Sequence, residues 1–286
     1  MMACTVGLFG NGRLGSLVAA TIRQRDDLDC RWQLGRGQRL TDLPTVDVAI
    51  DVSHADAVPA HLSWSADTGT DLVIGATGWP QSDLEGFHGQ GGVGVLIAPN
   101  FSLSMALLGR FATILGGYAA RSADSVDLAV AETHHRAKVD APSGSAAMLT
   151  AALAQGSGRE PGQIPTTSLR MGSVVGHHEV RYESATEAIG LAHHAHDRAI
   201  FADGAVAAAL WLQGRHGIFT LEDWAAEQLD DLFAPRNLTT TDPTTTQLTA
   251  PAHLTTTHPT TTPFAAPAHL TTAQIAAPSQ SLQEQR

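Results

Sequence analysis

Short apolar runs and helical patterns alternate over the first hundred residues. Leu14, Leu17, Val18 and Ile22 fall on one face of a helix, so a helix is predicted after the first run. The runs contain β-branched and aliphatic residues without polar alternation, as strands buried on both faces do. They occupy residues 5–9, 46–52, 72–74 and 93–98. Buried strands separated by helices predict a parallel α/β sheet.

The pattern changes after Asn100. The expected elements are a helix over about 103–118, a strand over about 126–131, a helix beginning at Ser143, strands over 170–180 and 187–194, and a helix over 205–212. This mixture is typical of an α+β domain inserted into the first one. We therefore predict a first domain formed by residues 1–102 and 199–235, with residues 103–198 forming the inserted domain.

The last 51 residues, 236–286, differ from the rest of the chain. They contain 15 Thr, 6 Pro and no Gly, with only four charged residues. The five residues 250–254 recur at 266–270, which gives a repeat of 16 residues without an apolar face. Such a segment cannot form a core, so a disordered low-complexity tail is predicted.

The charge of the chain is negative, with 17 Lys and Arg residues against 28 Asp and Glu and a net charge of −11. The tail carries two charges of each sign, so the acidic excess belongs to residues 1–235 and argues against a nucleic-acid partner. Two cysteines are too few for a disulfide framework. No apolar run approaches the length of a membrane span, and no signal segment is recognisable. We expect a cytosolic protein that binds neither nucleic acid nor membrane.

A glycine turn follows the first predicted strand and opens the first predicted helix. Its pattern, G-x-G-x-x-G at residues 10–15, is that of the dinucleotide-binding fingerprint, in which glycines let the backbone approach a diphosphate at a helix N-terminus. The alternative is a tight turn without a ligand. The candidate cofactor-binding residues of this turn are Gly10, Asn11, Gly12, Arg13 and Leu14.

The cofactor's ribose is usually held by an acid at the end of the second strand. Gly35 and Arg36 occupy that place here. A missing acid beside an arginine favours a 2′-phosphate, and therefore NADPH over NADH, although a solvated loop cation at Arg36 leaves NADH open.

Two further strands end in turns of the kind that bind ligands. Open α/β sheets bind ligands at the carboxyl ends of their strands. Each turn could equally be an ordinary glycine or proline turn. The candidate cofactor-binding residues here are Gly75, Ala76 and Thr77 after one strand, and Ala98, Pro99, Asn100 and Phe101 after the other.

The densest polar cluster lies at residues 132–146, between a strand and a helix. Its imidazoles, His134 and His135, can titrate near neutral pH, and Lys138 is the only lysine of the chain. Ser143 is a plausible N-cap that would leave the N–H groups of Gly144 and Ser145 free for an anion. A solvated loop with a good helix cap is the alternative. An amine able to transfer a proton is a property that arginine cannot replace, which favours a catalytic role for Lys138.

Histidines also cluster at residues 177–178 and at 193, 194 and 196, which raises the question of a metal site. Neighbouring histidines on a strand point to opposite sides, and no familiar zinc spacing with cysteine or acid is present. No metal is therefore expected.

The cluster resembles the signature of the dihydrodipicolinate (4-hydroxy-tetrahydrodipicolinate) reductase family, from the diaminopimelate route to lysine. The family pattern E-x-H-H-x-x-K-x-D-A-P-S-G-T-A is matched from Glu132 to Ala146 with Ser145 in place of Thr. The resemblance continues at residues 75–79, 98–102, 170–178 and 198–211, and it extends over about residues 4–233.

This resemblance implies a Rossmann-type nucleotide domain, an inserted mixed-sheet α+β domain for substrate binding and oligomerisation, and a homotetramer. It implies that NAD(P)H reduces a cyclic dicarboxylate at ring C4, with His134 and Lys138 as proton donors. It further implies substrate binding by His135, Gly144 and Ser145. The cofactor positions it implies are Gly10, Gly12, Arg13, Gly75, Ala76, Thr77, Ala98 and Phe101.

Four departures from the family pattern are present. The glycine turn is one residue shorter than the commoner G-x-x-G-x-x-G, Gly35 replaces the ribose-binding acid, Ser145 replaces Thr, and His177 replaces the acid of G-E-H. None of them alters His134 or Lys138, so an active enzyme is expected.

Two alternatives differ in class from this enzyme. One is a non-catalytic nucleotide sensor or scaffold on the same fold, since a fold does not imply a function. The other is a two-domain reductase for an aldehyde or ketone derived from an amino acid. That enzyme would not need the D-A-P-S-G-S stretch at residues 140–145.

Overall fold

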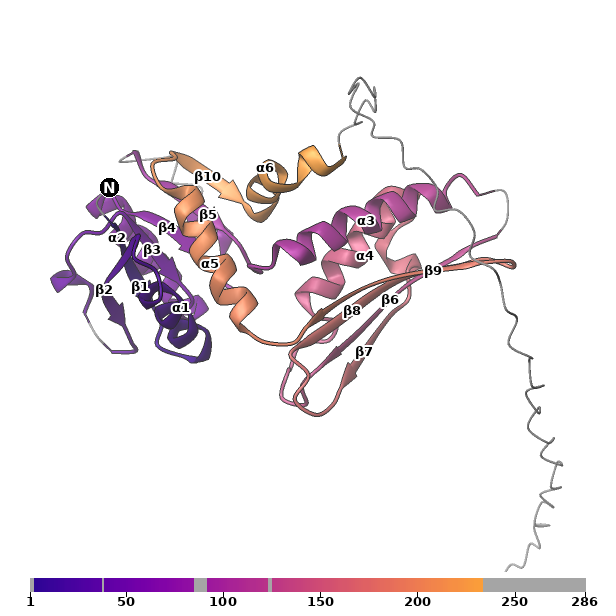
Figure 1. Ribbon diagram of the computed structural model, residues 1–286, viewed down its shortest axis with the longest axis horizontal. Coiled ribbons are helices and arrows are strands. Elements are labelled where there is room, and N and C mark those ends of the chain that lie inside the picture. The colour runs from indigo at the N-terminus through magenta and orange to yellow at the C-terminus, as the bar shows by residue number, and fades with distance from the viewer. Residues whose placement is uncertain (1–2, 38, 85–91, 123–124, 234–286) are drawn as a thin grey trace, which may run out of the picture. The chain divides into compact units, whose positions relative to one another are not determined.

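The computed structural model describes residues 3–37, 39–84, 92–122 and 125–233 of the chain (Figure 1). The predicted disordered tail, residues 236–286, lies outside the described residues. The described residues form two β-sheets, each with its own helices.

The first sheet has six parallel strands in the order β10-β5-β4-β3-β1-β2. Its strands are β1 Cys4–Phe9, β2 Leu28–Leu34, β3 Val48–Asp51, β4 Asp71–Ile74, β5 Gly94–Ile97 and β10 Gly217–Thr220. Because β2 and β3 lie on opposite sides of β1, the strand order reverses at β1, where open α/β sheets bind ligands. This is the predicted Rossmann-type sheet, and β10 joins it from the far end of the described chain.

Helices cover both faces of this sheet. On one face, α1 (Arg13–Arg23) and α5 (Ala199–Leu212) pack on Val6 and Leu8; on the other, α2 (Val58–Thr68) packs on Phe9. Strands buried on both faces explain the apolar runs without alternation. Gly15 lets α1 approach the sheet, because a Cβ there would lie 2.2 Å from the carbonyl oxygen of Gly10.

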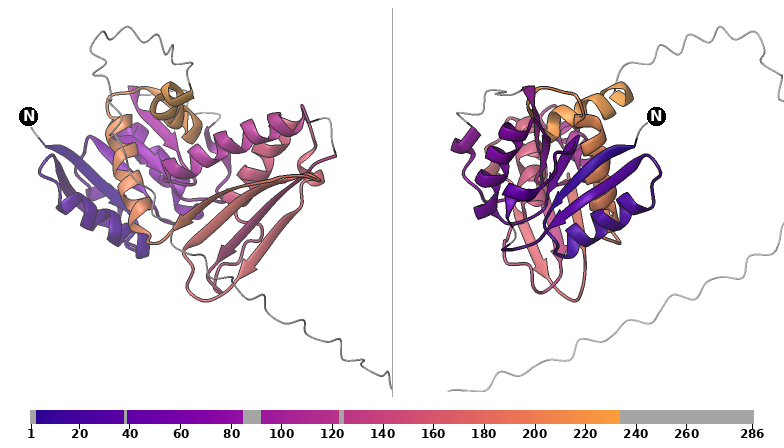
Figure 2. Two further views of the ribbon diagram at one scale, coloured as in Figure 1. Left: turned by 45° about the vertical axis from the view of Figure 1, so that its right-hand side comes forward. Right: turned by 90° about the vertical axis from the view of Figure 1, so that its left-hand side faces the viewer.

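The second sheet is mixed, with the strand order β7-β6-β8-β9. In this sheet β7 runs parallel to β6, while β8 is antiparallel to both β6 and β9. Two helices cover one face, where helix leucines such as Leu149 and Leu153 pack with Leu128 of the sheet (Figure 2). The bounds are β6 Asp127–His134, β7 Thr166–Arg170, β8 Gly176–Glu183, β9 Ala188–Ala195, α3 Leu103–Ala119 and α4 Gly144–Ser157.

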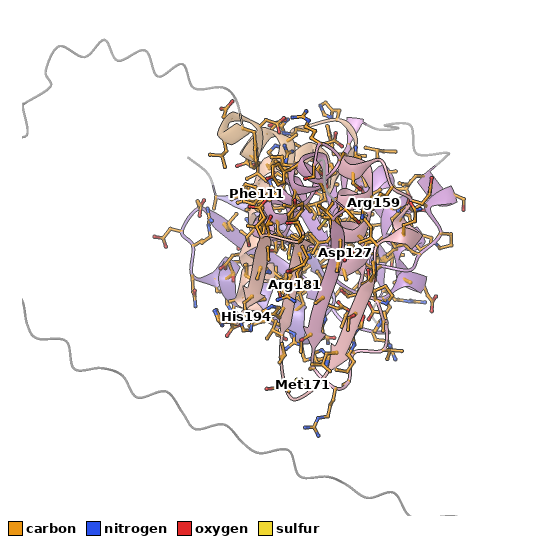
Figure 3. The ribbon with its side chains drawn as sticks, turned by 90° about the vertical axis from the view of Figure 1, so that its right-hand side faces the viewer. Phe111, Asp127, Arg159, Met171, Arg181 and His194 are labelled. Carbon is orange, nitrogen blue, oxygen red and sulfur yellow. The ribbon has the colours of Figure 1, made fainter. Side chains whose placement is uncertain are left out.

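The opposite face of the second sheet carries polar and small side chains. Figure 3 looks toward this sheet, with Asp127, Arg181 and His194 labelled on its strands. All three side chains are exposed. The residues of β6 alternate between buried and less buried positions, as expected for a sheet with helices on one face only.

The structure differs from the sequence-based prediction in several elements. The strand expected at residues 170–180 covers only the last residue of β7, an exposed turn in which Gly172 has a φ of +53°, and the first part of β8. The helix expected at 205–212 begins earlier, at Ala199. Elements not predicted include β7, β10, α2, α6 (Leu221–Phe233) and the short 3₁₀ helices at 40–42, 55–57, 81–84 and 161–163.

Helix α6 packs on α3 through Ala225 and Leu229, which contact Ala106, and Arg110 forms an ion pair with Asp230. Helix α6 follows β10 of the first sheet, so these contacts connect the first sheet to a helix of the second sheet. Within the described part of the chain, no helix is both long and apolar enough to cross a membrane.

Candidate active site

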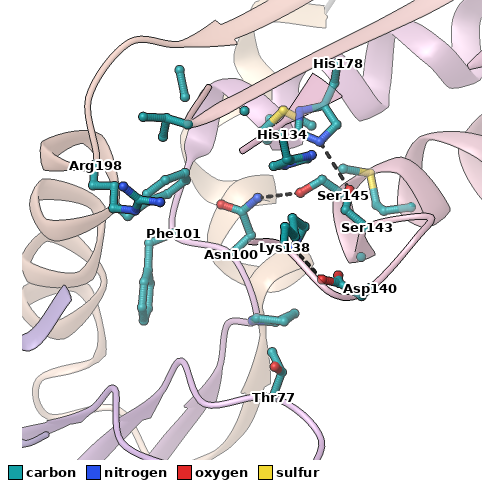
Figure 4. A pocket seen from close by; sticks show the side chains of 18 of the residues that line it. Thr77, Asn100, Phe101, His134, Lys138, Asp140, Ser143, Ser145, His178 and Arg198 are labelled. Carbon is teal, nitrogen blue, oxygen red and sulfur yellow. Dashed lines mark hydrogen bonds and ion pairs between the residues drawn. The ribbon is translucent and has the colours of Figure 1, made fainter. Parts of the chain in front are cut away.

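A cavity of about 750 Å³ lies where the ends of the first sheet's strands face the second sheet (Figure 4). One side is the β6–α4 wall, formed by residues 134–145 together with residues of β8 and β9. The other is the strand-end wall, formed by the turns that follow strands of the first sheet. The predicted residues that line the cavity are His134, His135, Lys138, Gly144, Ser145, Arg13, Leu14, Gly75, Thr77, Pro99, Asn100 and Phe101.

The other predicted residues lie near the cavity but do not line it. Ala76 and Ala98 are buried, so they can offer only backbone groups to a ligand. The rest lie along the turns after β1 and β2. They are Gly10, Asn11, Gly12, Gly35 and Arg36.

The turn between β1 and α1 has the shape of a diphosphate cradle. Gly10 has a φ of +110°, and a Cβ there would lie 2.8 Å from the carbonyl oxygen of Val52, so only glycine fits. Gly12 is the N-cap of α1, and no described atom lies within 4 Å of where its Cβ would be. A glycine turn with open space at a helix N-terminus is the kind of arrangement that binds the diphosphate of a dinucleotide.

The end of β2 carries Gly35 in place of a ribose-binding acid. A Cβ on Gly35 would lie 2.4 Å from Nδ2 of Asn11, the end of an exposed side chain. Beside it, Nη2 of Arg36 lies 2.9 Å from Nε2 of His54, and both side chains are exposed. A guanidinium and an imidazole therefore lie at the ends of the two strands that flank β1.

The β6–α4 wall is organised around one buried carboxylate. Strand residues alternate in direction, so Glu132 and His134 point to the same, helix-covered face. Glu132 is 2% exposed; its Oε1 accepts hydrogen bonds from Ser143 N at 2.9 Å, Ser168 Oγ at 2.7 Å and Arg170 Nη2 at 2.9 Å. Its Oε2 accepts from the hydroxyl of Ser143. Burial alone would raise the pKa of Glu132, but these hydrogen bonds outweigh it and lower the pKa to about 2.

Two imidazoles lie beside this carboxylate. Nδ1 of His134 is 3.2 Å from Oε2 of Glu132, and the rings of His134 and His178 are 4.9 Å apart. Burial lowers the pKa of His134, and the charge of Glu132 opposes this effect. Burial also lowers the pKa of His178, to about 4, so that His178 is neutral near pH 7.

The tautomer of His178 follows from the hydrogen bonds of Ser143. The hydroxyl of Ser143 has one hydrogen, which it donates to Glu132. Nε2 of His178, 3.3 Å from the same hydroxyl oxygen, must therefore carry the hydrogen and donate it. His178 and Glu132 thus hold Ser143 from two sides.

The loop between β6 and α4 carries the positive charge of this wall. Nζ of Lys138 lies 2.9 Å from Oδ1 of Asp140, and Arg170 donates to the carbonyl of Asp140. Burial would raise the pKa of Asp140, but the hydrogen bond from Lys138 and its charge lower it. The pKa of His135 is lowered by burial and by the charges of Arg198 and Arg13. An anion in the cavity would therefore meet several cations.

Helix α4 begins at this wall with free backbone donors. Ser143 is the N-cap and accepts a hydrogen bond from Ala146 N at 3.2 Å. No described atom lies within 4 Å of the Cβ position of Gly144, so space for a ligand remains above the helix start. Asn100 donates to Ser145 Oγ at 3.0 Å, which connects the two walls (Figure 4).

Comparison with known proteins places the chain. The family model described as "Dihydrodipicolinate reductase, N-terminus" matches residues 35–101, and that described as "Dihydrodipicolinate reductase, C-terminus" matches residues 103–224. A relative from Acidiphilium cryptum, named 4-hydroxy-tetrahydrodipicolinate reductase, is 37% identical over 230 residues, which are 73% of this chain and 92% of the relative. The chain belongs to the dihydrodipicolinate reductase family.

Two further members of the family are similar to this chain. A relative of the same name from Gluconacetobacter diazotrophicus is 39% identical over 199 residues, which are 63% of this chain and 77% of the relative. The structure of a dipicolinate-bound dihydrodipicolinate reductase from Paenisporosarcina sp. TG-14 superposes with a TM-score of 0.64 and 20% identity, covering 77% of this chain and 98% of that one. This likeness shows the same fold.

The departures from the family pattern lie at different places in the structure. His177 projects from the face of β8 opposite to His178, and its ring lies 5.0 Å from that of His194, away from the cavity. The hydroxyl of Ser145 accepts the hydrogen bond of Asn100. Gly35 and the short glycine turn both follow strands of the first sheet, β2 and β1.

Several cavity residues were not predicted as site residues. His178 and His193 are direct neighbours on β8 and β9, so the histidine pairs place one member each on the cavity face. The period of two in both strands was the signal available. Arg198, at the start of α5, lines the cavity as well, and Asp140 holds Lys138.

The described side chains that could hold a metal ion together are those of Glu132, His134 and His178. Their ligand-type atoms lie within 4.8 Å of one another, the one such group of three among the described residues. The carboxylate, however, already accepts hydrogen bonds from two hydroxyls, a backbone N–H and the guanidinium of Arg170. Because the carboxylate already accepts four hydrogen bonds and Arg170 supplies the balancing charge, these contacts do not favour a metal ion.

Proposed function

We propose that this chain reduces 4-hydroxy-tetrahydrodipicolinate to tetrahydrodipicolinate with NAD(P)H, in the diaminopimelate route to lysine. Its relatives bear the name of that reaction. The observation that carries the proposal is that His134, Lys138 and the N-terminus of α4 line one cavity with the turns of a dinucleotide-binding sheet. Proton donors, an anion site and a cofactor cradle thus lie within reach of one small molecule.

The substrate's two carboxylates fit the cations and backbone donors of the cavity. We assign one carboxylate to the N–H groups of Gly144 and Ser145 and to Lys138, because a helix N-terminus and an ammonium both stabilise an anion. His135 and Arg198 are the cavity residues we assign to the other. Held at both ends, the ring has one orientation toward the strand-end wall.

The strand-end wall would hold the nicotinamide cofactor, which supplies the hydride to ring C4 when bound. The diphosphate would lie on the backbone of the glycine turn at residues 10–14. The turns at 75–77 and 98–101 would face the nicotinamide half, because both follow strands whose carboxyl ends face the cavity. The 4-hydroxyl group of the substrate leaves as water before the hydride reaches C4, and the proton that completes the reduction comes from His134 or Lys138.

NADPH is the cofactor we propose as preferred. Arg36 offers its guanidinium to a 2′-phosphate, with His54 beside it, and Gly35 stands where the acid that would bind a 2′-hydroxyl is usually found. This preference goes beyond what the family alone gives.

The direct test measures oxidation of the cofactor. Purified full-length protein is mixed with freshly generated substrate and either NADPH or NADH, and the absorbance of the reduced nicotinamide is followed. Oxidation that depends on the substrate, faster with NADPH at equal low concentrations, is expected. Binding of NADPH without any substrate-dependent oxidation would instead favour the nucleotide sensor or scaffold.

We also propose that the chain forms a homotetramer and that residues 103–198 provide the contacts. The polar, small-residue face of the second sheet is exposed, and none of the described helices lies over it (Figure 3). Light scattering on the purified protein tests this, and a monomer at micromolar concentration would contradict it. A cytosolic location likewise stays a prediction.

A further inference from the structure

Glu132 lies behind the β6–α4 wall and does not itself line the cavity. Its side chain is fully buried, and both of its oxygens are used. It contacts two parts of the site that are separate in function. One is the imidazole of His134, and the other is the start of helix α4.

The first contact orients the imidazole. Nδ1 of His134 faces Oε2 of Glu132 at 3.2 Å, although it forms no aligned hydrogen bond with any described atom. The other ring nitrogen, Nε2, lies 3.3 Å from where a Cβ on Gly176 would be, and Gly176 lines the cavity. A carboxylate behind one nitrogen therefore leaves the opposite nitrogen beside the cavity. Catalytic hydrogen bonds that are poorly aligned without ligand commonly tighten when substrate binds.

The second contact fixes the helix start. The backbone N–H and the hydroxyl of Ser143 donate to different oxygens of Glu132. Ser143 is the N-cap, so its position sets the direction of the next N–H groups, those of Gly144 and Ser145. The same carboxylate thus holds both the proton-donating imidazole and the donors for an anion.

We propose that Glu132 is a positioning residue that aligns His134 for proton transfer and, through Ser143, aligns the start of α4 for a substrate carboxylate. This inference rests on the proposed reductase function. It assigns a role to a residue that touches neither substrate nor cofactor. One carboxylate thus fixes the position of the proton donor relative to the anion site.

The role requires the ionised carboxylate. Arg170 and the hydroxyls of Ser143 and Ser168 hold it in that form. The charged groups that act on His134 are Glu132 and Asp140, which favour the imidazolium, and Lys138 and Arg170, which oppose it. Removal of the charge of Glu132 would leave burial and two cations acting against protonation of His134, opposed only by Asp140.

The variant Glu132→Gln tests the proposal, because the amide keeps the size of the side chain and removes its charge. We expect kcat to fall about 100-fold, the scale of a lost general acid. An NMR titration of the His134 imidazole should show a lower pKa than in the native protein. Binding of NADPH, measured by calorimetry, should be unchanged and shows that the variant is folded.

Two serine variants separate the contacts. Ser143→Ala removes the hydroxyl link to α4 but leaves the charge next to His134. It should weaken binding of the dicarboxylate probe dipicolinate about tenfold, the effect of one charge-assisted hydrogen bond, without moving the His134 titration. Ser168→Ala removes one donor from the same carboxylate and touches neither part of the site. It is the matched control, with an expected change below about fivefold in kcat and in dipicolinate binding.

The outcomes distinguish this inference from the proposed function. If the native protein oxidises neither NADPH nor NADH, the reductase assignment fails, while the His134 titration and dipicolinate binding still test Glu132. If Glu132→Gln lowers kcat no more than Ser168→Ala does, or leaves the His134 titration in place, Glu132 is not a positioning residue. Should Glu132→Gln not fold, Ser143→Ala still decides: unchanged dipicolinate binding overturns the proposal.

Discussion

The two walls of the cavity hold their functional groups by different means. The β6–α4 wall is a network of buried side chains in which Glu132 receives four hydrogen bonds. The strand-end wall is mostly backbone, with space left open at Gly12 and an exposed pair, Arg36 and His54. The side chains of the first wall are therefore held in place before any ligand binds, whereas the second wall leaves open space that a ligand would fill. Substitutions should affect chemistry and stability at the first wall and cofactor choice at the second.

The largest expected effect belongs to Lys138. We expect Lys138→Met to lower kcat about 1000-fold, because it removes both a proposed proton donor and a cation from the β6–α4 wall. Lys138→Arg separates these roles, since arginine keeps the charge but cannot release a proton. Steady-state kinetics with NADPH measures both.

The matched control for this prediction is Arg136→Met, which removes an exposed cation from the same loop. Its kcat should stay near the native value. If Lys138→Arg is as active as the native protein, Lys138 binds a carboxylate without donating the proton.

The second prediction concerns stability in acid, which should depend on the β6–α4 wall. The pKa of His178 is lowered from 6.5 to about 4 in the folded protein, so the unfolded chain binds more protons below pH 6.5. Stability should therefore fall as the pH decreases from 6.5 to about 4, by about 3 kcal/mol from this group. The lowered pKa of Glu132 adds a further loss between pH 4.5 and about 2.

Urea unfolding at several pH values measures this loss. His178→Gln keeps an N–H donor for Ser143 and cannot titrate, so its stability should change less between pH 6.5 and 4. Equal slopes in the native protein and the variant would show that His178 is not responsible.

These two predictions depend on features that the sequence revealed to different degrees. The motif from Glu132 to Ala146 predicted His134, Lys138 and the cap at Ser143, because those residues lie in one continuous segment. The parallel sheet was predictable for a similar reason, since each buried strand is a local apolar run. The place of His134 and Lys138 beside the cavity and the helix start were therefore open to sequence reasoning.

The role of Glu132 was not predictable, because it depends on strand pairing. Glu132 is the direct neighbour of Ser168, and His134 that of Arg170, in the pairing of β6 with β7. The sequence pattern suggested one strand over residues 170–180, and β7 was not predicted at all. Without β7, neither the Arg170 contact nor the ionised state of Glu132 could be inferred. His178 and His193 were missed as site residues because their place beside the cavity depends on the pairing of β8 with β9.

The third prediction tests the strand-end wall. Arg36→Ala should weaken NADPH binding about tenfold and leave NADH binding nearly unchanged, because only NADPH has a 2′-phosphate. His54→Ala should have a smaller effect in the same direction. Calorimetric titration of both cofactors gives the ratio directly.

The control for this pair is Arg39→Ala, which removes a nearby exposed cation. It should weaken both cofactors equally and only slightly. A common loss for NADPH and NADH in Arg36→Ala would mean that Arg36 adds general charge and not recognition of the phosphate.

The smallest expected effect lies where the two walls meet. Ser145→Ala removes the hydrogen bond from Asn100, one contact that joins the turn after β5 to helix α4, and keeps the backbone N–H that we assign to the substrate. The free energy of unfolding should fall by about 1 kcal/mol, the usual value of one such bond. Because the contact spans both walls, KM should rise modestly, by about two- to threefold, for substrate and NADPH alike.

Ser145→Thr keeps the hydroxyl and restores the family residue, so both constants should return to native values. If Ser145→Ala changed KM for the substrate alone, the hydroxyl would belong to the β6–α4 wall only, and the two walls would act independently.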